Sequence, residues 1–402
     1  MVLNKNYRYA VTGYTSYQMK YKKRVGVYMS QKNKTFTVPA CSCMTLTSKG
    51  GKHYWFRTCD IGESLWNEGA HIVQCSKGSG IVYGDGHKEN TDYGFLGITY
   101  NRQDTWLLDG VNEEGLCGGL LMLYEGTSVE KADTDRAGYS GMELVTKILS
   151  SCQDVKAVIE LTKTIQILDV TLNNRKVAST MHYFFCDRQG KEVVLEAVDK
   201  TNRGILRCYS TKENIGVMTN SPSYERQLQN LSWFLANSPE MRQGIRGQAI
   251  RELWFDGRRV TADENAVHVS LSGDFPGSFA SYDRFLRLAI VKALNQSGNH
   301  FIEEEMLPLG SHMMNVVMEP NTGGIFHYTQ RKEDGSIIGQ KESFTQYIVM
   351  YDLEEKCFYI RVFDMVSWKK YRLIKIADGE KKSYEITHSL MQGVIMGNGN
   401  CD

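Results

Sequence analysis

The chain has 402 residues, of which 42% are hydrophobic, so it can bury a large core in one or two domains. Charged residues make up 23% of the chain and only 6 residues are proline, which excludes an extended disordered protein. Helix-like and strand-like segments are mixed along the sequence, which excludes an all-helical or fibrous protein.

Charge is unevenly distributed at the start of the chain. Residues 1–40 hold eight of the 47 basic residues and none of the 46 acidic ones, so residues 41–402 carry 39 basic and 46 acidic side chains. Such an acidic body is not typical of a nucleic-acid-binding protein. We interpret residues 1–40 as a leader or propeptide, although a basic tail that contacts an anionic surface is an alternative. Met29 is a second possible start.

Targeting and metal-binding signals are both missing from the sequence. No run approaches the roughly 20 apolar residues of a membrane helix, and the leader lacks the apolar core of a signal peptide. We therefore expect a cytoplasmic protein whose ten cysteines are reduced. Since no CxxC or HxxxH spacing occurs, we expect neither a metal nor a cofactor.

The first predicted elements form a hairpin. Val38–Thr47 and His53–Arg57 have the composition of strands, and Gly50-Gly51 supplies the turn between them. Residues 78–98 are glycine-rich and polar, so we predict a loop there. Gly115–Tyr124 has the pattern of a buried strand that another backbone approaches closely.

Two helices are predicted next, followed by a second hairpin. Gly141–Leu149 shows helical spacing, and a second helix follows in which Ser151 and Asp154 have the spacing of a capping box. The predicted strands His182–Asp187 and Glu192–Val198 flank a four-residue turn.

The remaining predicted elements are a strand, a helix and further strands. They are strand Asn214–Thr219, helix Tyr282–Asn295, the hairpin of Gln346–Asp352 and Cys357–Phe363, and strand Tyr371–Ile376. This order suggests layered sheets with helices outside.

Cys41 is the residue on which a catalytic interpretation depends. If the chain begins at Cys41, that residue gains an α-amine with a pKa of about 7.7–8.0 beside its own sulfur. Nucleophile and base then come from one residue, and no histidine is required. Taken alone, Cys41 and Cys43 would be interpreted as two core cysteines.

Arg57 and Asp60 support the catalytic interpretation. They lie 16 and 19 residues after Cys41, so the predicted hairpin would bring both back to the first strand. An arginine beside sulfur favours the thiolate, and an aspartate can hydrogen-bond an α-ammonium. As an isolated pair, Arg57 and Asp60 would be interpreted as a surface ion pair.

The segment Cys41–Asp60 resembles the opening of the choloylglycine hydrolases, a family that includes bile salt hydrolases and penicillin V acylases. Further segments similar to this family follow in order, and the resemblance spans residues 41–376. They are Asp109–Leu116, Gly216–Tyr224, Asn230-Leu231, Gly273-Asp274-Phe275 with Arg284–Arg287, and Thr345–Tyr347.

The resemblance implies an α+β protein with the four-layer αββα sandwich of N-terminal-nucleophile hydrolases, in which residues 41–402 form one catalytic domain. It implies hydrolysis of linear non-peptide amides through a thioester. Cys41 would be nucleophile and, through its amine, base. Asp60 would orient the amine and Arg57 would tune the thiolate. Asn220 would donate to the oxyanion, a contact worth roughly 3 kcal/mol, and Arg284 would support the site electrostatically.

The sequence departs from the family at several positions. Met122 stands where bile salt hydrolases have Asn and penicillin V acylases have Tyr, so we expect its backbone N–H to serve the oxyanion. Thr58 and Cys59 replace the usual residues between the arginine and the aspartate. The stretch between Asn230 and Gly273 differs from the usual glycine-rich loop, which leaves the family's tetramer contacts open.

Several alternatives stay open from the sequence. Cys43 is a rival nucleophile. Candidate substrates are conjugated bile salts, phenoxyacyl penicillins and N-acyl homoserine lactones, and Trp55, Phe56 and Trp66 could line an apolar pocket or the core. The expected partner is a small-molecule amide, with a homo-oligomer possible. Other hypotheses are a Cys–His hydrolase using one of the nine histidines, and an inactive binding homologue with a basic leader.

Overall fold

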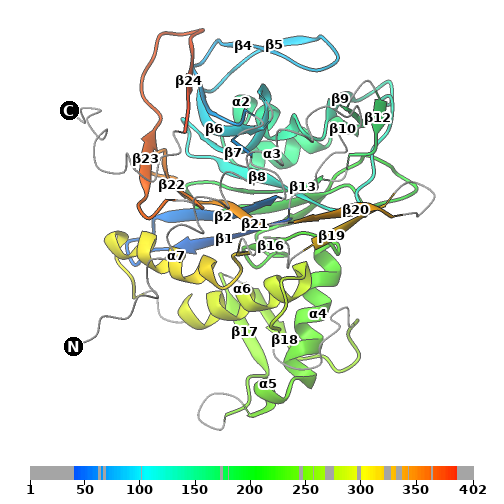
Figure 1. Cartoon of the computed structure of the whole chain (residues 1–402), viewed down its shortest axis with the longest axis vertical. Coiled ribbons are helices and arrows are strands. Elements are labelled where there is room, and N and C mark those ends of the chain that lie inside the picture. Colours follow the sequence, from blue (N-terminus) through cyan, green and yellow to red (C-terminus); the bar gives the residue numbers. More distant parts are fainter. Residues whose placement is uncertain are drawn as a thin grey trace, which may run out of the picture. The chain divides into compact units, whose positions relative to one another are not determined.

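Two stacked sheets with helices on both outer faces form the body of the protein (Figure 1). The computed structural model describes residues 40–61, 65–66, 69–100, 102–172, 175–179, 181–243, 248–256, 258–267, 276–296, 300–320, 327–331, 337–342, 344–363 and 365–386. All of these belong to the compact unit Thr37–Asp402.

The first sheet contains the predicted N-terminal hairpin. Its strands in the described residues are, in spatial order, β16 (Val217–Thr219), β1 (Ala40–Thr47), β2 (His53–Ile61), β21 (Phe344–Asp352), β22 (Cys357–Val362) and β23 (Lys369–Arg372). Every neighbouring pair is antiparallel. The strand β2 is therefore central and joins the N-terminal hairpin to the C-terminal one.

The second sheet packs against the first. Its strands are β15 (Arg207–Ser210), β14 (Glu192–Glu196), β13 (Met181–Cys186), β8 (Cys117–Met122), β7 (Gln103–Asn112), β6 (Phe95–Tyr100), β3 (Ile72–Cys75) and β24 (Lys381–Tyr384). Five of these strands (β3, β6, β8, β13 and β14) are buried along their whole length, as expected for a sheet covered on both faces.

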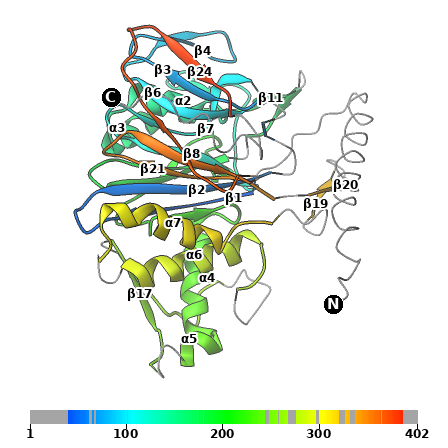
Figure 2. The same cartoon turned by 60° about the vertical axis from the view of Figure 1, so that its left-hand side comes forward.

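Helices cover the outer face of each sheet (Figures 1 and 2). Helices α2 (Leu144–Ser151) and α3 (Val155–Thr162) pack on the second sheet. Helices α6 (Ser281–Gln296) and α7 (Met306–Asn315) pack on the first. The predicted four-layer αββα order is confirmed.

The other described elements connect the layers or extend from them. They are helices α4 (Tyr224–Asn237) and α5 (Pro239–Gln243), the 3-10 helix η2 (Glu303–Glu305), and the two-stranded pairs β4 (Gly80–Val82) with β5 (Lys88–Asn90), β9 (Ala137–Ser140) with β10 (Ile165–Leu168), β11 (Val170–Leu172) with β12 (Arg175–Val177), β17 (Glu252–Phe255) with β18 (Arg258–Thr261), and β19 (His327–Arg331) with β20 (Ile337–Glu342). No helix in this described part is both long and apolar enough to cross a membrane.

Two adjacent aromatic residues of β2 illustrate how the layers are held together. Trp55 packs edge-on against Tyr351, with ring centroids 5.8 Å apart, and its ring lies against Gly119 of the second sheet. Phe56 points the opposite way, and its ring lies so close to Gly310 of α7 that a Cβ there would clash. Alternating side chains of one strand thus bind the sheet to both neighbouring layers.

Three local predictions need correction. Residues 78–98 are not a plain loop, because they contain β4, β5 and the start of β6. Ser151 does not cap the second helix. It is the last residue of α2, and Asp154 is the N-cap of α3, with its carboxylate accepting from the Ala157 N–H. The strand predicted over Tyr371–Ile376 lies earlier, over Lys369–Arg372, where pairing with β22 is available.

Candidate active site

The Cys41 side chain is buried on the face of β1 that packs against the second sheet. Nη2 of Arg57 lies 3.1 Å from Cys41 Sγ, although Arg57 is opposite Cys43 in the strand register. Nη1 of the same guanidinium donates to Asp109 Oδ2 at 2.7 Å and to the Leu108 carbonyl at 2.6 Å. The arginine therefore bridges the Cys41 sulfur and a buried carboxylate on β7.

Asp109 is held in turn by two tyrosines of β21. Tyr347 and Tyr351 donate their hydroxyls to the two oxygens of Asp109, each at 2.5 Å. Arg57 and Asp109 both have fully buried side chains, so their charges compensate each other away from water. Such a pair is stable only when its remaining polar atoms also find partners, which the tyrosines provide for the carboxylate.

The surroundings of Cys41 favour its thiolate. Burial by itself raises the pKa of the Cys41 thiol, but hydrogen bonding with the Cys59 thiol, the charge and hydrogen bond of Arg57, and a backbone hydrogen bond from Asp60 together lower it to about 6. Burial raises the pKa of Cys43 well above its ordinary value, and its thiol donates to the Met218 carbonyl. Geometry and charge therefore favour Cys41 over the rival Cys43.

The other face of β1 is organised by Arg284 on α6. Its Nη1 donates to the Cys41 carbonyl at 2.7 Å and to Ser42 Oγ at 2.6 Å, while Nη2 donates to Asn220 Oδ1 at 2.9 Å. The same Asn220 oxygen accepts the Cys41 N–H at 2.6 Å. The backbone nitrogen and the carbonyl of Cys41 are thus both hydrogen-bonded to side chains.

Asp60 on β2 is paired with Ala40, the residue that precedes Cys41 on β1. Thr345 donates to its Oδ1 at 2.5 Å, and Arg284 lies 3.6 Å from its Oδ2. A second buried carboxylate, Glu319, lies 3.8 Å from Arg284. Burial and then the charge of Glu319 raise the pKa of Asp60 well above its ordinary value, against the opposing effect of Arg284. Two buried carboxylates therefore lie near one guanidinium.

Met122 contacts Asn220 through its backbone carbonyl, not through its backbone N–H. Asn220 Nδ2 donates to the Met122 carbonyl at 3.0 Å, and Met122 pairs with Met181 of β13. The backbone predicted to serve the oxyanion is therefore adjacent to the asparagine. Its N–H role stays a prediction.

The predicted aromatic pocket residues occupy packing positions. Trp55 and Phe56 are fully buried, and Trp66 is half-buried with its ring 5.8 Å from Tyr347. Substrate contact for these three stays a prediction. The segment Gly273-Asp274-Phe275 lies outside the described residues.

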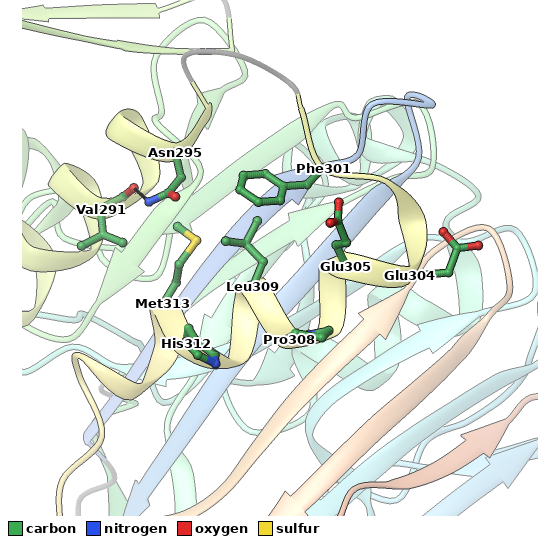
Figure 3. Close-up of a pocket in the computed structure, with 9 residues that line it drawn as sticks. All are labelled: Val291, Asn295, Phe301, Glu304, Glu305, Pro308, Leu309, His312 and Met313. Carbon is green, nitrogen blue, oxygen red and sulfur yellow. Dashed lines mark hydrogen bonds between the residues drawn. The ribbon is translucent and has the colours of Figure 1, made fainter.

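A pocket of about 520 Å³ lies elsewhere, within the helical layer on the first sheet (Figure 3). Phe301, Leu309 and Met313 point into it from α7 and the segment before it. Its other lining residues are Val291, Asn295, Glu304, Glu305, Pro308 and His312. Since none of these residues belongs to the cluster around Cys41, we do not assign the substrate to this pocket. Over the described residues, His, Cys, Asp and Glu form no group of three that could hold a metal.

The structure brings together all five catalytic residues predicted from the sequence, which are Cys41, Arg57, Asp60, Asn220 and Arg284. Three further neighbours of the site, Asp109, Glu319 and Cys59, were not predicted from the sequence. Asp109 opens a segment that resembled the family, and a buried arginine needs a carboxylate partner, so that signal was present. Glu319 had no local signal, because only the packing of α6 brings Arg284 to it.

Comparisons with known proteins show the family of the chain. The family model for linear amide C–N hydrolases of the choloylglycine hydrolase family matches residues 41–377. A bile salt hydrolase/transferase of Clostridium perfringens is 29% identical over 258 residues, covering 63% of this chain and 71% of the relative. One from Lactiplantibacillus plantarum is 22% identical over 331 residues, covering 80% and 89%.

Two solved structures share the fold. A variant of conjugated bile acid hydrolase from Clostridium perfringens has a TM-score of 0.66 at 22% identity, covering 86% of this chain and 97% of that one. Penicillin V acylase from Agrobacterium tumefaciens has a TM-score of 0.60 at 17% identity, covering 86% and 91%.

Proposed function

Because the chain belongs to the choloylglycine hydrolase family of linear amide C–N hydrolases, we propose that it cleaves conjugated bile salts or similar N-acyl compounds, with Cys41 as nucleophile once residues 1–40 are removed. The bile-salt assignment is supported by two relatives named as bile salt hydrolase/transferases. Removal of the leader is supported by the start of the family match at Cys41.

The observation that carries the proposal is the pair of contacts made by Cys41. Its sulfur accepts a hydrogen bond from Arg57 Nη2 at 3.1 Å, and its backbone N–H donates to Asn220 Oδ1 at 2.6 Å. The first contact favours a thiolate, and the second holds the nitrogen that becomes the base. A residue with only a packing role would need neither contact.

The proposed reaction begins when the Cys41 sulfur attacks the amide carbonyl carbon. An oxyanion forms, and the Asn220 amide and the Met122 backbone N–H stabilise it, each worth roughly 3 kcal/mol. The α-amine, which has accepted the proton of the Cys41 thiol, transfers that proton to the leaving nitrogen, so the C–N bond breaks and a thioester remains. Water attacks the thioester with the amine as base, which releases the acid and restores the cysteine.

The charges around Arg284 suit the amine that this reaction needs. Asp60 and Glu319 supply two carboxylates, whereas Arg284 supplies one cation. An α-ammonium at Cys41 would add a second cation and balance the cluster. The carboxylates would therefore orient the amine and raise its affinity for a proton.

Acyl transfer is a second activity of the same thioester. Both curated relatives are named as transferases as well as hydrolases. An amine that attacks the thioester in place of water would form a new amide, with the same proton transfers. We include this activity in the proposal.

The test combines the intact mass of the purified protein with release assays. We expect a mature mass beginning at Cys41, and release of glycine from glycocholate and taurine from taurocholate; penicillin V is the comparison substrate. Cys41→Ala is the inactive control. A mature protein that releases neither amino acid would contradict the bile-salt substrate. Full activity in a chain that retains residues 1–40 would contradict the mechanism.

A further inference from the structure

A second thiol faces the candidate nucleophile across the strand pair. Cys59 on β2 is directly opposite Cys41 on β1, and both are fully buried. Directly opposite residues of antiparallel strands have Cα atoms about 4.5–5.5 Å apart, which is within the range that disulfides bridge. The strands need not separate for these two sulfurs to bond.

One guanidinium contacts both sulfurs. Nη2 of Arg57 lies 3.1 Å from Cys41 Sγ and 3.9 Å from Cys59 Sγ. The same environment lowers the pKa of Cys41, whereas burial and the neighbouring Cys41 raise the pKa of Cys59 well above its ordinary value. The pair therefore consists of a thiolate beside a thiol, and a thiolate is the form that reacts with peroxides.

We propose that Cys41 and Cys59 form a reversible redox pair, in which Cys59 resolves the peroxide-oxidised Cys41 into a disulfide. The proposal rests on the proposed function only in that the site must open to small molecules. It gives a role to Cys59, one of the two residues at which the Cys41–Asp60 segment departs from its family.

The chemistry balances with hydrogen peroxide as oxidant. The Cys41 thiolate attacks one peroxide oxygen, so an S–O bond forms, the O–O bond breaks, and hydroxide leaves. The Cys59 sulfur then attacks the Cys41 sulfenic acid, so the S–S bond forms, the S–O bond breaks, and water leaves with the Cys59 proton. A dithiol reductant returns two electrons and both protons, which restores the nucleophile.

Cys43 is the matched comparison. It lies two residues from Cys41 on the same strand, a separation of about 6.8 Å at which parallel side chains are poorly placed for a disulfide. Its thiol also donates to the Met218 carbonyl. Cys43 should therefore take no part in the pair.

The experiment uses the processed protein, wild type and the variants Cys59→Ala, Cys59→Met and Cys43→Ala. Each is treated with hydrogen peroxide, quenched with N-ethylmaleimide, mapped by mass spectrometry without reduction, and assayed before and after dithiothreitol against its own untreated activity. For wild type and Cys43→Ala we expect a Cys41–Cys59 linked peptide, about 2 Da lighter than the two thiols, and activity about 10-fold lower that dithiothreitol restores.

The Cys59 variants should lose activity without recovery. Without a resolving thiol, Cys41 proceeds to the sulfinic acid, about 32 Da heavier, which dithiothreitol does not reduce. Recovery in both Cys59 variants, or a linked peptide joining Cys41 to another cysteine, would overturn the proposal. If the untreated protein hydrolyses no amide, the proposed function fails, and the linked peptide still decides the redox pair.

Discussion

The side-chain oxygen of Asn220 accepts the backbone N–H of Cys41 at 2.6 Å while that nitrogen is still part of a peptide bond. The Arg284 guanidinium donates hydrogen bonds to the same oxygen at 2.9 Å and to the Cys41 carbonyl at 2.7 Å. The backbone on both sides of the Cys41 Cα is therefore positioned before any cleavage. Under the proposed mechanism, processing would release an amine whose place is already defined.

Replacing Cys41 and Cys43 separately should distinguish the two candidate nucleophiles. Cys41→Ala should lower kcat by about 10³-fold or more, because the sulfur and its thioester are lost. Cys43→Ala should leave most of the activity, because the Cys43 thiol donates to the Met218 carbonyl and burial raises its pKa well above its ordinary value. The measurement is kcat for glycocholate. Equal losses in the two variants would contradict the assignment.

The reactivity of Cys41 should depend on pH with a low midpoint. Since its pKa is lowered to about 6, alkylation of the Cys41 peptide by iodoacetamide should rise through that pH, not through the ordinary value of about 8.5. The lowered pKa also implies stability that is fully present above the unfolded-state pKa and is lost as the pH falls through about 6.

The matched variant for this experiment is the double substitution Arg57→Gln with Asp109→Asn, which removes both charges of the buried pair together. Its alkylation midpoint should move upward toward the ordinary value, because the guanidinium no longer favours the thiolate. An unchanged midpoint would show that Arg57 does not tune Cys41.

Asn220→Ala should reduce kcat by about 10²–10³-fold through loss of one oxyanion donor. Its KM should change much less, since the donor acts on charge that develops in the transition state. Steady-state kinetics on glycocholate measure both constants. A rise in KM with kcat unchanged would assign Asn220 to substrate binding instead.

Asp109→Asn should destabilise the fold by about 3–5 kcal/mol, because it leaves the Arg57 charge buried without its partner. Urea unfolding measures the difference. Glu225→Gln is the control, since Glu225 pairs with Arg207 at the surface, where both side chains are about half exposed. That variant should change stability by less than about 1 kcal/mol. Similar losses in both variants would refute the special importance of the buried pair.

Local sequence signals predicted much of the architecture. The hairpin with Gly50-Gly51 appears as expected, with Gly51 at a φ of 81°, and the helix predicted over Tyr282–Asn295 is α6. The predicted strand boundaries were wrong where pairing with a distant strand decides which residues are extended. The strand near residue 370, for example, begins where β22 offers hydrogen-bond partners. Hydrophobic periodicity does not show which residues find such a partner strand.

The sequence alone determined which side chains could perform the chemistry: a cysteine at the start of a strand, with Arg57 and Asp60 within reach through one hairpin. Only the tertiary structure decided how the charges are balanced, since Asp109 and Glu319 reach Arg57 and Arg284 from distant parts of the chain. A hairpin is a local event that a turn and alternating side chains specify. Pairing of buried charges depends instead on how sheets and helices pack, and that packing is a property of the whole core.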